Sequence, residues 1–312
     1  MVAPNNPVQR EVLLIRVRSY LMLAMTVTLV LALAGCKSGV LDPHGPVGAA
    51  QRTILLNALA IMLAIVVPTI LAILGFAWWF RASNARARYF PDWAYSGRIE
   101  LVVWSIPILV VLFLSGVIWI GSYELDPARP LNSNVNPLNV QVVSLDWKWL
   151  FIYPDQGVAT VNELVVPART PLHFRLTSSS VMTAFFVPQL GSMIYTMNGM
   201  TTQLHLQADQ EGDFYGRASH FSGDGFPGMQ FTLRAVSNDA FDAWVRRAQD
   251  AGAVLDQASY TGLAKPSANV PPATYRLAET DLFQQVATRA LPPGPGPAAG
   301  KPARDVSHRI GD

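Results

Sequence analysis

Residues 53–80 read TILLNALAIMLAIVVPTILAILGFAWWF, and this stretch decides the architecture of the 312-residue chain. It contains no ionisable side chain over 28 residues, and a second stretch, Leu101–Gly121, contains none over 21. The hydrocarbon core of a bilayer is about 30 Å thick and takes roughly 20 apolar residues of helix to cross. Both stretches are therefore predicted to be transmembrane helices rather than buried helices of a soluble protein.

Basic residues predict the orientation of this helical hairpin. Four arginines lie between the two spans: Arg81, Arg86, Arg88 and Arg98. The outer flanks carry fewer basic residues, namely Lys37, Arg52 and Arg129. Because basic loops stay on the cytoplasmic side, residues 122–312 are predicted to lie outside the cytoplasm. A net charge of +2 without a basic stripe argues against a nucleic-acid partner.

The single cysteine of the chain, Cys36, follows a predicted signal peptide, residues 1–35. Three arginines precede an apolar run, Leu21 to Leu33, which ends in Leu33-Ala34-Gly35-Cys36. This arrangement resembles the lipobox of bacterial lipoproteins. The resemblance implies that Cys36 is lipidated, becomes the mature N-terminus and anchors residues 36–121 to membrane lipid. The alternative is a buried or unused free cysteine.

The sequence after the second span changes to short alternating segments. A Pro/Asn-rich linker, residues 122–136, precedes alternation at 138–142, 172–176 and 203–207. This pattern predicts an antiparallel β-sandwich or barrel over residues 137–236. Residues 237–290 are predicted to form a helical extension, with a helix N-cap at Ser237-Asn238-Asp239. Residues 291–312 are predicted to form a flexible, Pro/Gly-rich tail. The fold class is thus a membrane-anchored α+β protein.

Three segments of the predicted sandwich resemble subunit II of the haem–copper terminal oxidases, whose outer domain is a cupredoxin. They are DWKWLFIYP at 146–154, VMTAFFVPQLG at 181–191 and FYGRASHFSGDGFPGMQF at 214–231. The resemblance covers about residues 36–290. It is greatest to subunit II of the cytochrome bo-type ubiquinol oxidases, and it implies a bacterial inner-membrane location with the C-terminal domain in the periplasm.

The departures from the family pattern concern its copper site. In the cytochrome c oxidases of this family two coppers are bound by an upstream His and by a Cys-x-Glu-x-Cys-x₃-His-x₂-Met loop. The corresponding positions here are Thr183, Ala218, His220, Ser222, Phe226 and Met229. Thiolates hold Cu(I), whereas a methyl group or a phenyl ring coordinates nothing. We therefore expect no metal and no cofactor in this chain.

The resemblance implies the function of such a chain. Without copper it cannot pass electrons from a soluble cytochrome c, so it would be a non-redox subunit of a quinol:oxygen oxidoreductase. Haem groups, copper and ubiquinol are then expected in the catalytic subunit I, and subunits III and IV are expected partners. Two alternatives remain open: a copper-bearing subunit II of a cytochrome c oxidase, and a non-enzymatic cupredoxin-like lipoprotein such as an assembly factor.

The sequence also allows predictions for individual polar and aromatic residues. Glu100, at the start of the second span, either reaches back to water or, as the resemblance implies, serves as a proton entrance. His173 and His205 are expected on the solvated surface, and His220 is expected to be a polar loop residue. Four alternating aromatics are predicted to lie on one strand face: Trp147, Trp149, Phe151 and Tyr153. Such a face is typical of core or interface packing, and without copper the preferred interpretation is packing against the large subunit.

Overall fold

The computed structural model describes residues 19–20, 39–88, 90–250 and 252–296. The predicted signal peptide therefore lies outside the described residues except for Ser19 and Tyr20, and so does Cys36. Residues 297–312 of the predicted tail lie outside them as well. A 3₁₀ helix, η1 (Gly39–Leu41), is the first element after this gap.

Two long helices form the hairpin that the apolar stretches predict. Helix α2 (Pro46–Trp79) has 34 residues and α3 (Gly97–Glu124) has 28, and both are long and apolar enough to cross a membrane. Gly48 is the one buried residue of the two helices. Their apolar side chains therefore point outward, as expected for helices that face lipid or a partner.

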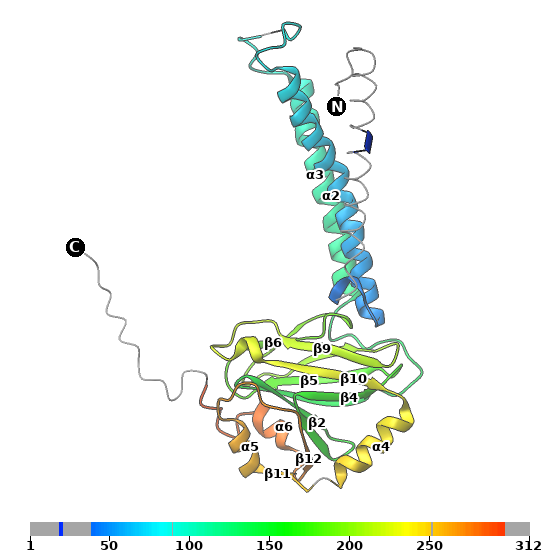
Figure 1. Cartoon of the computed structure of the whole chain (residues 1–312), viewed down its shortest axis with the longest axis vertical. Coiled ribbons are helices and arrows are strands. Elements are labelled where there is room, and N and C mark those ends of the chain that lie inside the picture. Colours follow the sequence, from blue (N-terminus) through cyan, green and yellow to red (C-terminus); the bar gives the residue numbers. More distant parts are fainter. Residues whose placement is uncertain (1–18, 21–38, 89, 251, 297–312) are drawn as a thin grey trace, which may run out of the picture.

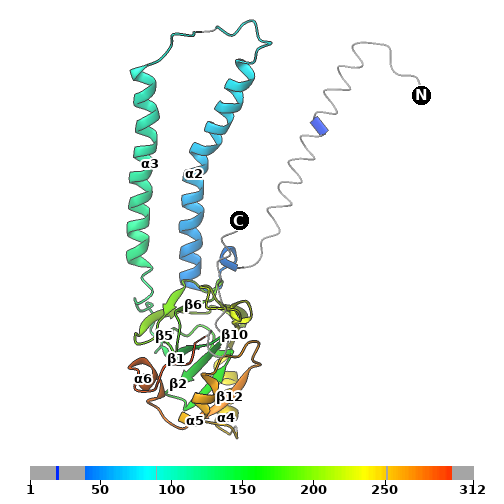
Figure 2. The ribbon, with the colours of Figure 1, turned by 90° about the vertical axis from the view of Figure 1, so that its left-hand side faces the viewer.

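The hairpin stands on one end of the β-domain. Figure 2 shows α2 and α3 rising from the domain side by side, with the loop between them at the far end. The arginine-rich loop and residues 122–296 therefore lie at opposite ends of the helices, as the charge pattern requires. The two helices meet near the domain, where a Cβ on Gly121 would lie 2.9 Å from Cδ1 of Ile54.

The β-domain is a sandwich of two sheets (Figure 1). The first has the order β11-β12-β3-β2-β1-β5-β8. Its strands are β1 (Leu138–Leu145), β2 (Lys148–Tyr153), β3 (Val158–Val161), β5 (Leu172–Ser178), β8 (Thr202–Leu206), β11 (Val254–Leu255) and β12 (Ala273–Leu277). The second has the order β4-β10-β9-β6-β7. Its strands are β4 (Glu163–Pro167), β6 (Thr183–Phe186), β7 (Ile194–Thr196), β9 (Gly212–Ala218) and β10 (Gln230–Val236).

The strands expected from alternation are present as β1, β5 and β8, but the sheets are mixed rather than antiparallel. Strand β1 pairs with β5 in parallel, β4 with β10, and β11 with β12. Each of these pairs joins strands that are separated in sequence by other elements, so no hairpin forces an antiparallel pairing. The sequence pattern identifies strands but not the crossovers between them.

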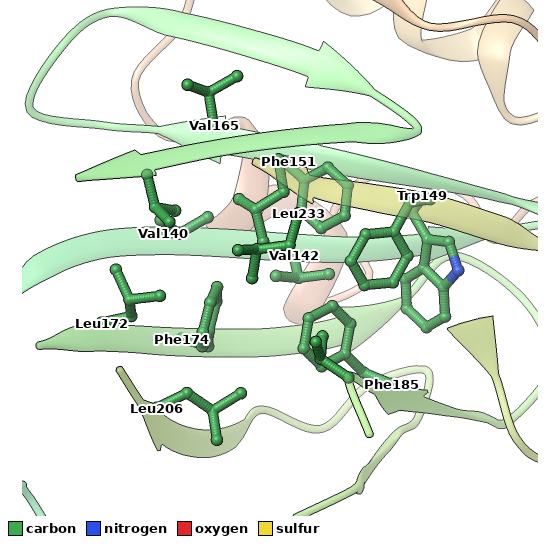
Figure 3. Packing of buried hydrophobic residues seen from close by; sticks show 14 of the residues in the cluster. Val140, Val142, Trp149, Phe151, Val165, Leu172, Phe174, Phe185, Leu206 and Leu233 are labelled. Carbon is green, nitrogen blue, oxygen red and sulfur yellow. The ribbon is translucent and has the colours of Figure 1, made fainter. Parts of the chain in front are cut away.

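Two clusters of apolar side chains cover both faces of the seven-stranded sheet. One fills the space between the two sheets, where Figure 3 shows Trp149, Phe151 and Phe185 with their aliphatic neighbours. The other lies between the seven-stranded sheet and the C-terminal extension, whose α5 (Gln257–Leu263) and α6 (Leu282–Ala287) contribute Tyr260 and Phe283. The central strands are therefore buried on both sides.

The C-terminal extension differs from its predicted form. Helix α4 (Asn238–Gln249) begins as predicted, because the Ser237 side chain accepts a hydrogen bond from the Ala240 N–H. Strands β11 and β12, however, extend the seven-stranded sheet, so residues 237–290 are not purely helical. The segments are too short and too mixed in burial to show a strand period.

The start of the predicted tail is also corrected. Leu291 is buried in the second apolar cluster, and the Gly294 N–H donates to the Ser179 carbonyl. The chain is therefore ordered against the sandwich at least to Gly294.

Candidate functional site

The six positions of the degenerate copper site come together at one end of the second sheet. Thr183 begins β6, and its hydroxyl donates to the His220 carbonyl at 3.1 Å. The Ala218 N–H, at the end of β9, donates to the Met229 carbonyl at 2.9 Å. The short 3₁₀ helix η2 (Phe226–Gly228) closes the loop, and the Met229 N–H donates to the Phe226 carbonyl.

The side chains at these positions do not fit a dicopper centre. The hydroxyls of Thr183 and Ser222 are already engaged, the latter as a donor to the Met229 sulfur at 4.0 Å. The methyl group of Ala218 and the ring of Phe226 offer no donor. One thioether and the imidazole of His220 remain, without the thiolates that stabilise Cu(I). Within the part of the chain that the structure describes, no three His, Cys, Asp or Glu side chains form a cluster suited to a metal.

His220 keeps one unpaired atom at this site. Its ring meets Tyr195 edge-on at 5.7 Å between centroids, and its buried Nδ1 has no hydrogen-bond partner among the described residues. His220 is therefore a loop residue, as predicted, but it is half-buried and its Nδ1 is shielded from solvent. A lone imidazole nitrogen next to a thioether is a weak ligand set.

The space beside the loop is filled by Trp147. This residue lies in the turn between β1 and β2, with φ of 69°, and not on the strand as its alternating position predicts. The indole N–H donates to the Ser222 carbonyl at 3.0 Å. A Cβ on Gly225 would come within 2.2 Å of the indole ring, so the loop packs directly on this tryptophan.

The other three aromatics point into the domain from one face of β2. Trp149, Phe151 and Tyr153 have no exposed surface. Trp149 meets Phe185 edge-on at 5.4 Å, and Phe151 lies 5.1 Å from Phe231. The prediction that these aromatics pack against a large partner subunit is wrong, because the second sheet covers them.

Tyr153 is tied to the neighbouring strand by its hydroxyl. The hydroxyl donates to the Val165 carbonyl and accepts from the Val165 N–H, both at 2.9 Å. Burial is the main cause that raises the pKa of Tyr153 far above its usual value. The phenol therefore remains neutral and joins the two sheets.

Two charged side chains are buried at the β1–β2 turn. Lys148 is 1% exposed, and its ammonium group donates to the carbonyls of Lys265 and Asp146 at 2.9 and 3.3 Å. Burial lowers the pKa of Lys148 to about 8, against the opposing effect of the Asp146 charge. The Asp146 carboxylate accepts from the Ser180 hydroxyl through one oxygen, and the other oxygen has no partner among the described groups. The C-terminal extension thus covers this ionisable pair.

Alternation predicted that both strand histidines are solvated, but one of them is buried. His173 and His205 face each other across β5 and β8, and their rings are stacked at 4.7 Å. His205 is 8% exposed, and its backbone N–H donates to the Pro127 carbonyl at 3.0 Å. Burial lowers the pKa of His205. The linker that leaves α3 covers this residue, which the strand pattern could not reveal.

Glu100 lies far from the six positions of the degenerate copper site. It is exposed in the first turn of α3, at the end of the hairpin remote from the sandwich (Figure 2). This position leaves its predicted proton role untested. The predicted lipidation residue, Cys36, lies outside the described residues.

Fold and site together define a membrane-attached, cupredoxin-like domain whose copper positions carry other side chains. A family model for the periplasmic domain of cytochrome c oxidase subunit II matches residues 116–236. A second, the COX aromatic rich motif, matches residues 249–294 and so covers most of the extension.

Similar curated proteins show to which family within this class the chain belongs. Cytochrome bo(3) ubiquinol oxidase subunit 2 of Pseudomonas aeruginosa is 48% identical over 259 residues, which is 83% of this chain and 78% of the relative. Ubiquinol oxidase subunit 2 of Acetobacter aceti is 48% identical over 261 residues, 83% of this chain and 85% of the relative. The chain belongs to the bo-type subunit II family of the haem–copper oxidases. Two apolar helices joined to such a domain fit a protein of the inner membrane.

A solved structure gives a weaker likeness. The periplasmic domain of subunit II of cytochrome oxidase from Bradyrhizobium japonicum is 25% identical. It covers 39% of this chain and 98% of its own, at a TM-score of 0.37.

Proposed function

We propose that this chain is the non-redox subunit II of a quinol:oxygen oxidoreductase, in which subunit I holds the haem groups and copper and oxidises ubiquinol. The observation that carries the proposal is the side-chain set at the loop of the six positions. At four of the six positions, hydroxyls engaged in hydrogen bonds, a methyl group and a phenyl ring stand where two metals would need thiolate and imidazole ligands. A subunit built in this way braces the complex and relays no electrons.

The relatives support the same assignment. Their names describe subunits of ubiquinol oxidases, and they match this chain over most of its length. We propose that subunits III and IV complete the complex, that Cys36 is lipidated, and that the β-domain lies in the periplasm. The arginine-rich loop on the opposite end of the hairpin favours that orientation.

Oxygen consumption by the purified complex tests this function. We expect rapid uptake with ubiquinol as the reductant and no uptake above background with reduced soluble cytochrome c. The same preparation provides both measurements, so enzyme loss cannot imitate the result. Uptake driven by cytochrome c at a rate near that of quinol would contradict the proposal.

We also propose that Glu100 lies at a proton entrance. Its carboxylate is exposed at the end of α3 that the charge pattern assigns to the cytoplasm, where membrane-edge carboxylates collect protons. Glu100→Gln should slow quinol-driven turnover while haem content stays constant. Asp92→Asn, in the same interhelical loop, is the matched control and should leave turnover unchanged. Equal turnover in both variants would remove the proton role.

A further inference from the structure

A cavity of about 330 Å³ lies at the junction of the hairpin and the β-domain. It is bounded by the start of α2, the end of α3 and the linker that follows, and His205 lines it from β8. Its charged lining residues are Glu124, Asp126 and Arg129. The volume falls at the small end of ligand sites, which measure roughly 300–1,000 Å³. Neither the copper positions nor Glu100 contribute to it.

The walls of the junction cavity are fixed to the β-domain from both sides. At the start of α2 the Gly48 N–H donates to the Leu190 carbonyl at 3.0 Å, so this N–H is not free for a ligand. At the exit of α3 the Pro127 carbonyl accepts from the His205 N–H, and His205 Nδ1 lies 3.3 Å from the same oxygen. The two helices are therefore both anchored where they join the domain, and the cavity is a built feature rather than a gap between loose segments.

The charges that line the junction cavity are not paired with each other. None of the three ion pairs in the described part of the chain includes Glu124, Asp126 or Arg129. Asp126 caps the Ala128 N–H at 2.9 Å, and Arg129 reaches the Tyr123 carbonyl at 3.4 Å. Two carboxylates and one guanidinium thus face the cavity, together with the imidazole of His205. A ligand that carries both an anionic and a cationic group matches this set.

The depth of the junction cavity indicates the source of such a ligand. Glu124 lies three residues beyond the uncharged stretch that ends at Gly121, a rise of about 4.5 Å along a helix. The polar layer on each side of a bilayer is about 5–8 Å thick. Trp119 and Tyr123 lie just before Glu124, are 69% and 68% exposed, and have the character of interfacial aromatics. The cavity therefore opens at the level of lipid headgroups.

We propose that the junction cavity binds the headgroup of a phosphoethanolamine lipid. The guanidinium of Arg129 contacts the phosphate, the carboxylates of Glu124 and Asp126 contact the ammonium group, and the acyl chains lie along the apolar surface of the hairpin. An anionic headgroup without an amine would meet two carboxylates and only one cation, so the site selects a zwitterion. This inference requires the chain to lie in a membrane but is independent of the proposed redox role.

Lipid retention by the full complex tests the proposal. The complex is reconstituted in nanodiscs with equal parts phosphatidylethanolamine and phosphatidylglycerol, re-extracted in detergent and washed, and retained lipid is measured by native mass spectrometry. Wild type should retain phosphatidylethanolamine preferentially, and Arg129→Gln should reduce that retention about tenfold, the effect of losing a charge-assisted hydrogen bond. Arg217→Gln, an exposed arginine on β9, is the control and should behave as wild type.

The double variant Glu124→Gln/Asp126→Asn tests selectivity separately. It should retain phosphatidylglycerol in preference to phosphatidylethanolamine, and because the readout is a ratio it is insensitive to yield. Soluble phosphoethanolamine in the wash should leave retention unchanged, whereas displacement would identify a soluble ligand and overturn the lipid assignment. Equal retention ratios in wild type and both junction variants would overturn the site itself.

Discussion

At the scale of single residues, the interior of the domain depends on a few polar groups held in apolar surroundings. The Tyr153 hydroxyl satisfies both backbone groups of Val165 on the other sheet. Trp147 joins the degenerate loop to the β1–β2 turn, and Lys148 joins that turn to the C-terminal extension. Each of these side chains bonds to backbone, so each fixes a loop or strand rather than another side chain.

Tyr153→Phe should destabilise the domain by about 1–3 kcal/mol, because it leaves the N–H and carbonyl of Val165 buried without a partner. Tyr215→Phe is the matched control: its hydroxyl bonds to Gln230 at the surface, and its side chain is 50% exposed. Denaturant unfolding of the full chain in detergent, followed by tryptophan fluorescence, gives both values. An equal effect of the two substitutions would refute the role of the buried hydroxyl.

The buried ammonium of Lys148 predicts a pH dependence of stability. Its pKa falls to about 8 in the folded chain from 10.5 in a free side chain. Below pH 8 the folded state therefore bears the full cost of the buried charge. Between pH 8 and 10.5 the folded state releases the proton before the unfolded state does, so stability rises with pH. Between pH 7.5 and pH 9.5 only part of this difference in protonation is expressed, so the gain in that window is about 1–2 kcal/mol.

Lys148→Met isolates this contribution. The melting temperature of wild type relative to Lys148→Met should increase from about pH 7.5 to about pH 9.5, the window that the lowered pKa opens. Tyr153 and Tyr260 act in the opposite sense: their pKa values are raised by burial, so they reduce stability once unfolded tyrosine ionises near pH 10. The comparison is therefore made below that pH. A difference between the two proteins that is constant with pH would contradict the assignment.

At the scale of elements, the sequence predicts the strands that keep one exposed face, and for the buried strand β2 it predicts the strand but not what covers it. Strands β1 and β5 and helix α4 show clear periodicity because one face of each is more exposed than the other at several positions. Strand β2 is buried at all six positions, with Trp149 and Phe151 facing one apolar cluster and Leu150 and Ile152 the other. Because both faces of β2 are apolar, the sequence pattern does not show which part of the protein covers the aromatic face.

The C-terminal extension covers the face of the seven-stranded sheet that points away from the second sheet. It supplies β11 and β12 at the edge of the sheet, and α5 and α6 over its outer face. The face of β2 that carries Leu150 and Ile152 is therefore covered within the chain, as the second sheet covers the face that carries Trp149 and Phe151. The junction cavity was equally beyond prediction, because it forms only where the ends of α2 and α3 meet β8 in the folded chain.

A further prediction concerns the loop between β9 and β10, which contains Gly225. Gly225→Ala should destabilise the chain by about 1–3 kcal/mol, because its backbone tolerates alanine but the new Cβ would overlap the Trp147 ring. Gly262→Ala in α5 is the control, since no atom lies within 4 Å of a Cβ there and alanine favours a helix. Thermal unfolding of both variants provides the comparison. A Gly225→Ala protein as stable as wild type would show that the loop does not pack on Trp147.

At the scale of the whole molecule, two spans already hold the chain in the membrane. Cys36→Ala should abolish the proposed lipidation and leave the chain in the membrane fraction, because one or two acyl chains add little to two transmembrane helices. Alkaline extraction of membranes followed by immunoblotting measures this directly. Release of the variant into the soluble fraction would show that the hairpin alone does not anchor the chain.

If this subunit carries no redox metal, as we propose, its own metal content shows this most directly. Subunit II is separated from the purified, copper-supplemented oxidase complex, and its copper is quantified by mass spectrometry alongside its electron paramagnetic resonance spectrum. We expect copper at the level of a metal-free control protein and no resonance from a mixed-valence pair. Two copper ions per chain with such a resonance would contradict it.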